Sequence, residues 1–316
     1  MSTSLFIDKL YADFNSKSPH ENIFFSPYCI SLTLPILLLG SEGETQKQIF
    51  DSGGLMKKPP AVDTKTDSSE VIYSSNLFLE SSLDVNSEYV NAIKRLGCTV
   101  YNLSYLTDSD RKKSVKYVNE LVSEQTRNRI KQILNHESLN VFTKAIISSV
   151  IYFEAKWSQK FYRLHTSLKD FYNSDGTKTQ VSMMKQTGDK YFSYDEDLKV
   201  KCVGKFYENS LYIMWFFLPD EGFKLTKDLT VDKMLSMIDK SEEKLVHLSV
   251  PRFKIEYEKP LKETFNLLGM TDMFDIKKAD FSKISDEPEI HVSDIFHKAF
   301  LEVNEDGTIA GAVTRK

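Results

Sequence analysis

The last seventeen residues of the chain, FLEVNEDGTIAGAVTRK, place the tightest limit on its fold. They begin with an apolar stretch that fits a strand and then pass two acids, Glu305 and Asp306. The next eight residues, Gly307 to Thr314, contain no charge and no proline. Their β-branched members favour extended structure, and their alanines and glycines are small enough to lie between packed strands. Two interpretations remain open: a flexible tail, or a segment that is a loop in one state and a strand in another.

The bulk composition is that of an ordinary globular protein. The chain has 316 residues, of which 41% are hydrophobic, enough for one large domain or two. The formal net charge of −4 argues against general nucleic-acid binding, which needs a basic patch. No apolar run approaches the length needed to cross a membrane. We therefore expect neither nucleic acid nor a membrane as a partner.

The three cysteines, Cys29, Cys98 and Cys202, are far apart and odd in number. Their spacing fits neither a disulfide framework nor a metal site, so no metal and no cofactor is expected. Free thiols suit a reducing compartment, and the N-terminus lacks the apolar run of a secretory signal. We expect a cytoplasmic protein, with an extracellular location as the alternative.

The common catalytic motifs do not occur in the sequence. There is no Gly-x-Ser-x-Gly elbow, no phosphate-binding glycine-rich loop and no His-Glu-x-x-His. The six histidines are scattered, and no two have ligand spacing. Although a catalytic triad can be dispersed along a chain, we expect no enzyme and assign no catalytic residue.

The order of the expected elements indicates an α+β fold, because helices dominate the first half and strands the second. Expected helices are 2–17, one opened by Pro27 that Pro35 should kink or end, Glu44–Asp51, Asn86–Leu96, Asp108–Leu134, Val231–Ile238 and Leu261–Leu268. Expected strands are Asn22–Ser26, Val71–Glu80, Ala145–Phe153, several within Lys169–Phe217, Val246–Tyr257 and Glu289–Val303. The stretch Ser52–Glu70, with its Gly-Gly and Pro-Pro pairs, is expected to be a loop.

Several blocks, in chain order, match the pattern of one known family. His297 to Thr308 reads HKAFLEVNEDGT, and Asn22 to Pro27 reads NIFFSP. Further matching positions are Ser31, Gly40, Gly43, Thr45–Ile49, Val118–Lys131, Thr143–Trp157, Val181–Met184, Val250–Lys254, Leu268–Phe274 and Ala279–Ser282. Together they resemble the serpins, inhibitors of serine and sometimes cysteine proteases, over nearly the whole length.

The resemblance implies a serpin fold over residues 1–316 as a single domain, with smaller sheets around a large central sheet that contains 71–80, 145–157 and 290–303. The family pattern continues beyond the hinge into further strands, whereas this sequence stops at Lys316. We expect the domain to be incomplete after the hinge, with its C-terminal strands missing, through either cleavage of the reactive loop or truncation.

The resemblance also implies a function. In serpins a protease attacks the reactive loop as bait, and the freed hinge inserts into the large sheet. The attached protease is distorted, so the acyl-enzyme is not hydrolysed. The hinge residues implied here are Glu305, Asp306, Gly307, Thr308, Ile309, Ala310, Gly311, Ala312, Val313 and Thr314. A non-inhibitory serpin that binds a ligand or a client protein, and an inert fragment, are the alternatives.

A second set of residues belongs to the region where the family's central strands open: Ser26, Ser31, Ser149, Trp157 and His297. The resemblance implies that His297 holds two central strands together. The family's usual asparagine partner is Ser149 here, whose hydroxyl is shorter, so the contact is direct, mediated by water, or lost. The expected partner is a target serine or cysteine protease, and the protein is expected to be a monomer. Heparin is not an expected partner, because the region after Asp51 is short and poorly helical.

Overall fold

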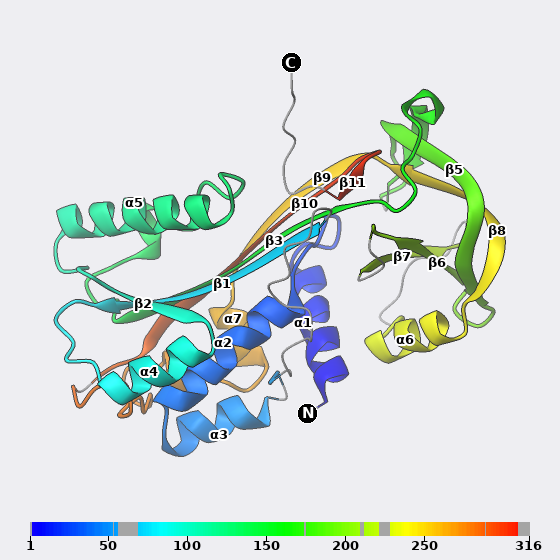
Figure 1. Ribbon diagram of the computed structural model, residues 1–316. Coiled ribbons are helices and arrows are strands. Elements are labelled where there is room, and N and C mark those ends of the chain that lie inside the picture. Colours follow the sequence, from blue (N-terminus) through cyan, green and yellow to red (C-terminus); the bar gives the residue numbers. More distant parts are fainter. Residues whose placement is uncertain are drawn as a thin grey trace.

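A six-stranded sheet forms the centre of the molecule, in the order β2-β1-β3-β11-β10-β9 (Figure 1). The computed structural model describes residues 2–52, 54–55, 69–173, 175–208, 212–220, 228–287 and 289–308. The strands of this sheet are β1 (Ser69–Glu80), β2 (Cys98–Leu103), β3 (Ala145–Lys156), β9 (Phe253–Pro260), β10 (Val292–Val303) and β11 (Gly307–Thr308). The expected α+β fold, with a large central sheet built on these segments, is confirmed.

Helices cover both faces of this sheet (Figure 1). The helix α5 (Asp108–Gln125) lies on one face. On the other face lie α1 (Thr3–Lys17), α2 (Pro27–Gly40), α3 (Gly43–Asp51), α4 (Ser87–Arg95) and α7 (Lys262–Leu267). Five of these six helices come from the first 125 residues, as the sequence predicts.

The strand β3 is buried on both faces because its side chains alternate between two apolar cores. Ile147 packs with Leu34 of α2 in the larger core. Ile146 and Val150 pack with Val122 of α5 in the second core. The near-continuous apolar sequence of this strand follows from that double burial.

The two middle strands, β3 and β10, run parallel and pair directly from Ala145 and Val292 to Ile151 and Ala299. Beyond that point β11 lies between them. It is antiparallel to both strands, with Thr308 opposite Ala155 on one side and Val303 on the other. The start of the C-terminal segment therefore already occupies the end of the gap between the middle strands.

A second sheet lies beside the first, at the right in Figure 1. Its strands are β4 (Ser167–Tyr172), β5 (Lys178–Asp195), β6 (Val200–Phe206), β7 (Ile213–Pro219) and β8 (Glu242–Pro251), and it carries α6 (Val231–Asp239). Three short 3₁₀ helices are His136–Ser138, Arg163–His165 and Asp272–Phe274. A bridge between Trp157 and Tyr207 joins the end of β3 to the turn after β6.

Of the two outcomes expected at Pro35, a kink or an end, the end does not occur, because α2 continues to Gly40. Most of that helix is buried, and its apolar contacts outweigh the cost of a proline, about 3 kcal/mol. One expectation about helix length is wrong. The helix expected to reach Leu134 ends at Gln125. Thr126 Oγ accepts from Ile130 N–H at 3.1 Å, and Asn128 has a φ of 63°. These side-chain and backbone arrangements take up the groups that would continue the helix.

The expected strand Asn22–Ser26 is also wrong, because this segment has no ladder partner. The Ser26 N–H donates to a histidine side chain instead of to a neighbouring strand. The ring of Phe25 packs edge-on against Phe14 of α1, with centroids 5.0 Å apart. The expected loop at 52–70 lies mostly outside the described residues.

Candidate functional site

The hinge begins as a short strand whose first residue has room only for glycine. A Cβ atom on Gly307 would lie 2.2 Å from Ala155 O and 2.8 Å from Lys156 Cα, both backbone atoms. The next residue, Thr308, is completely buried. Its hydroxyl forms a short hydrogen bond with the hydroxyl of Tyr207. The close approach of two backbones thus explains the glycine, and the enclosed site explains the small side chain after it.

Trp157 fixes the turn that leads into this strand. Its indole N–H donates to Asn304 O at 2.9 Å, and its backbone N–H donates to Asp306 O at 3.0 Å. Its ring stacks on Tyr207 with a centroid distance of 4.4 Å and an interplanar angle of 13°. The side chain of Asn304 closes the turn, because Oδ1 accepts from Gly307 N–H at 3.2 Å. Trp157 and Tyr207 together hold both ends of the turn.

The two acids of the turn meet basic side chains in different environments. Glu305 is buried and accepts from Thr166 Oγ at 2.9 Å, with Arg252 Nε 3.6 Å away. Asp306 lies nearer the surface, 2.8 Å from Arg163 and 3.2 Å from Lys160. The hydrogen bond from Arg163 lowers the pKa of the Asp306 carboxyl, with a further contribution from Lys160. The turn is therefore anchored by one buried acid and one partly exposed acid.

His297 lies within the paired stretch of the middle strands, opposite Ser149 and two pairs before direct pairing ends, and it joins three elements. Its Nε2 accepts from Ser26 N–H at 3.1 Å, which requires the proton of the neutral ring to be on Nδ1. Nδ1 then donates to Ser149 O of β3 at 3.1 Å. The side chain is fully buried, and burial lowers the pKa of its imidazole to about 4. His297 thus ties β10 to β3 and to the start of α2 as a neutral ring.

The three serines expected near His297 make different contacts. The Ser149 hydroxyl donates to Cys29 O at 2.7 Å, so this residue meets His297 only through its backbone carbonyl. The Ser26 hydroxyl accepts from Cys29 N–H at 3.2 Å and caps α2. The Ser31 hydroxyl donates to Tyr28 O at 2.7 Å within the helix. Side-chain contact between His297 and Ser149, the direct option, is not made.

Lys298 adds a contact on the other face of β10. This lysine is 6% exposed, and its Nζ donates to Gln132 O at 2.7 Å and to Glu258 at 2.8 Å. Glu256 lies 3.1 Å from the same nitrogen. The segment around Gln132 packs over the middle strands through Ile130, Ile133 and Leu134. Lys298 therefore fastens the segment that follows α5 to β10.

The structure gathers the expected site residues into two groups. Ser26, Ser149 and His297 meet within the directly paired stretch of β3 and β10. Trp157 instead lies with Glu305, Asp306, Gly307 and Thr308 at the far end. Ser31 stays within α2, and the remaining hinge positions, Ile309–Thr314, lie outside the described residues.

Several residues of the site were not expected from the sequence: Asn304, Tyr207, Thr166, Arg163, Lys160, Arg252 and Lys298. Asn304, next to the two acids, carries the one local signal, since asparagine favours turns. Lys298 directly follows His297 and Lys160 lies three residues after Trp157, but no local pattern marks either one, and Tyr207, Thr166, Arg163 and Arg252 are separated from the hinge by more than 50 residues.

Within the described ranges, no three His, Cys, Asp or Glu side chains are grouped so that they hold a metal ion. Nor does that part of the chain contain a helix long and apolar enough to cross a membrane.

Comparison with known proteins gives one consistent result. The profile of the Serpin family (serine protease inhibitor) matches residues 1–316. Leukocyte elastase inhibitor A of Mus musculus is 32% identical over 99% of this chain and 87% of its own length. Native protease nexin-1, solved with heparin, aligns with a TM-score of 0.89 at 27% identity and covers 99% of this chain and 89% of its own. Uncleaved ovalbumin aligns with the same TM-score at 23% identity, over 96% and 86% of the two chains, and shows the fold alone. The chain belongs to the serpin family of serine protease inhibitors.

Proposed function

We propose that this protein inhibits a serine or cysteine protease by insertion of its cleaved reactive loop into the central sheet, with residues 1–316 acting as one serpin domain rather than as an enzyme. The nucleophile of the protease attacks the scissile carbonyl, and the amine of the C-terminal part of the loop leaves. An ester or thioester then joins the loop to the protease. Insertion displaces the catalytic groups of the protease, so water no longer hydrolyses this bond.

One observation carries the proposal: β11 lies between β3 and β10 and is antiparallel to both. The two middle strands are parallel to each other over their paired length. A longer insertion along the same line would replace one parallel ladder with two antiparallel ladders. Antiparallel pairing is slightly more stable per residue and adds new hydrogen bonds. This arrangement supports insertion along the line of β11, with the gain in hydrogen bonding as its driving force.

The contacts of His297 and Lys298 set the resistance to that insertion. Separating β3 from β10 breaks the direct ladder and the bond from His297 to Ser149 O. It also loosens the attachment of α2 through Ser26. These buried contacts keep the middle strands closed until cleavage releases the loop. We propose the roles of Ser26, Ser149 and His297 on this basis.

The test uses the protein with its complete reactive loop and a panel of serine and cysteine proteases. An inhibitor forms a complex that survives SDS, whereas a non-inhibitory serpin or an inert fragment does not. Thr308→Arg places a charge at a fully buried position next to Tyr207, where burial is unfavourable. This variant is expected to be cleaved while forming at least tenfold less complex.

The matched control is Thr179→Arg, because Thr179 is exposed on β5. It should trap the protease as the unmodified protein does. Undiminished trapping by Thr308→Arg would rule out insertion at this hinge. A protein that neither traps nor inhibits any protease of the panel would point to the ligand-binding or client-binding alternative.

We further propose that the protein acts as a monomer in the cytoplasm. Cys29, Cys98 and Cys202 are all free and buried, and free thiols persist in a reducing compartment. Burial raises the pKa of the Cys29 thiol to about 12, so this group is unreactive. Fractionation of cells that make the protein, together with its mass in solution, tests both statements.

A further inference from the structure

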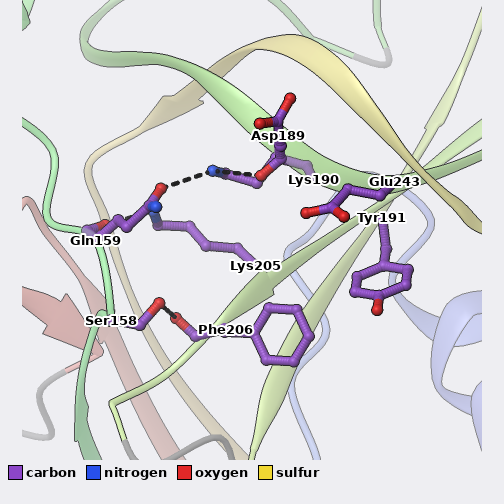
Figure 2. A pocket seen from close by; sticks show the side chains of 8 residues that line it. All are labelled: Ser158, Gln159, Asp189, Lys190, Tyr191, Lys205, Phe206 and Glu243. Atoms are coloured by element: carbon purple, nitrogen blue, oxygen red, sulfur yellow. Dashed lines mark hydrogen bonds between the residues drawn. The ribbon is translucent and has the colours of Figure 1, made fainter.

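Two buried lysines, Lys190 of β5 and Lys205 of β6, line one cavity of about 280 Å³ beside the end of β3 (Figure 2). Lys190 is 6% exposed and Lys205 is 1% exposed. Buried ammonium groups are normally paired with carboxylates, because a buried charge without a partner is costly. These two groups therefore need an explanation.

Among the residues that the structure describes, both lysines have only neutral acceptors. Lys205 Nζ donates to Gln159 O at 2.7 Å and to Gln186 Oε1 at 2.6 Å. Lys190 Nζ donates to Gln159 Oε1 at 3.0 Å and to Asp189 O at 3.1 Å. Within the part of the chain that the structure describes, neither forms an ion pair with a carboxylate. An ammonium has three N–H donors, so each lysine keeps one N–H without a described protein acceptor.

Aromatic rings offset only part of the uncompensated charge. Lys205 Nζ lies 4.3 Å from the ring centroid of Phe161 and 5.1 Å from that of Trp157. Such contacts favour a cation over a ring face. Even so, burial and the neighbouring charge of Lys190 lower the pKa of Lys205 to about 7. Burial also lowers the pKa of Lys190.

Two carboxylates, Asp189 and Glu243, also line the cavity, but at its exposed rim. In Figure 2 the Glu243 carboxylate points toward the interior and the Asp189 carboxylate points away from it. Among the described residues neither carboxylate forms an ion pair with Lys190 or Lys205, and exposed charges are screened by salt more than buried ones are. The floor of the cavity therefore remains positive despite the acidic rim.

We propose that the cavity floor binds a small oxyanion with two negative charges, of the sulfate or phosphate class, between Lys190 and Lys205. Such an ion would accept the free N–H of each lysine and compensate both charges at once. Sites for drug-sized ligands occupy ~300–1,000 Å³, so a cavity of about 280 Å³ suits an inorganic ion or one terminal group. A sulfated polysaccharide chain is too large to enter it whole.

Titration calorimetry with sodium sulfate, and in parallel with inorganic phosphate, tests the proposal. Sodium chloride at matched ionic strength is the reference. One saturable site is expected on the unmodified protein for at least one of the two oxyanions. Lys205→Met should weaken that binding at least tenfold. Lys244→Met is the matched control, because Lys244 lies opposite Lys190 in the ladder and its side chain is 53% exposed; it should bind as the unmodified protein does.

Lys190→Met serves as the second variant and alone decides the matter if Lys205→Met does not fold. Sulfate also stabilises proteins without binding a site, but that effect does not saturate and would persist in both variants. Fluorescence of Trp157, isolated by Trp215→Phe, gives a second readout, because this ring lies next to Lys205. The proposal would be overturned if the unmodified protein showed no saturable binding of either oxyanion. It would also be overturned if Lys190→Met and Lys205→Met each bound the oxyanion as tightly as the unmodified protein does.

Discussion

Gly307 and Ala155 approach so closely that a methyl group on the glycine would overlap the alanine carbonyl oxygen, at 2.2 Å. Because the obstacle is backbone on a central strand, it cannot move aside as a side chain would. The identity of this one residue therefore decides whether the hinge lies in the sheet.

Gly307→Ala is expected to expel the hinge from its place beside β3. The backbone amides of Thr308 and Trp157 should then exchange with solvent at least tenfold faster, as measured by hydrogen exchange and mass spectrometry. Gly188→Ala is the control, because a Cβ there would lie no closer than 3.5 Å to the end of the Lys190 side chain. Unchanged protection of Thr308 in Gly307→Ala would show that β11 does not depend on this approach.

His297→Ala should destabilise the protein more than Ser149→Ala. Removing the imidazole leaves Ser26 N–H and Ser149 O without their partner in a buried site, which costs about 1–3 kcal/mol in addition to the cavity. Removing the Ser149 hydroxyl takes one hydrogen-bond donor away from Cys29 O. That carbonyl lies in α2 and keeps its helical hydrogen bond. Urea midpoints give the comparison, and equal midpoints would contradict this account.

The free energy of unfolding should decrease as the pH is lowered from about 6.5 to about 4, because of His297. The folded pKa is lowered from 6.5 to about 4, so the unfolded chain binds the extra proton first. The stabilisation is complete above pH 6.5 and is lost as the pH falls toward 4. At pH 5 the loss should be about 2 kcal/mol.

The matched comparison is His297→Gln, which lacks the titrating group. Its free energy of unfolding should lose about 2 kcal/mol less between pH 7.5 and pH 5 than that of the unmodified protein. Parallel pH profiles for the two proteins would argue against a neutral, buried His297.

The two acids of the hinge turn should differ in their effect on stability. Asp306→Asn should cost less than about 1 kcal/mol, since its partners Arg163 and Lys160 have side chains 78% and 57% exposed. Glu305→Ala should cost about 1–3 kcal/mol, because it removes a buried carboxylate and leaves its partly buried contact with Thr166 unmade. Thermal melts measure both, and a larger effect from Asp306→Asn would reverse the assignment of the stronger anchor.

Heparin should not accelerate inhibition by this protein. The expectation rests on the Gly-Gly and Pro-Pro pairs in Ser52–Glu70, which oppose a basic helix there. Rates of complex formation with and without heparin measure the effect. A marked acceleration would require a basic surface elsewhere on the chain.

Local signals in the sequence predicted most of the elements. The apolar run from Ala145 identified a strand buried on both faces, and Pro27 marked the start of α2. Local signals failed where packing or a distant partner decided the outcome. Pro35 lies inside a buried helix, and Ser26 N–H bonds to His297, 271 residues away.

The candidate site shows the same division. Its position followed from the family resemblance of the hinge, whereas its partners did not. Trp157 bonds to Asn304, 147 residues away, and the hydroxyls of Tyr207 and Thr308 are separated by 101 residues. Such pairs arise from sheet register and from the arrangement of the two sheets, which a single sequence does not report.

The bond between Lys298 and Gln132 O has a consequence for the order of events. The segment that it fastens runs from α5 to β3, yet it is attached to β10. A strand inserting between β3 and β10 would have to pass beneath this segment, which is attached to β10 on one side of the insertion path. On the proposed mechanism, breaking the contact between Lys298 and Gln132 would be a kinetic step, which would limit the rate of insertion and not the stability of the final sheet. Because insertion competes with release of the protease, Lys298 on β10 would then influence what fraction of the protease is trapped.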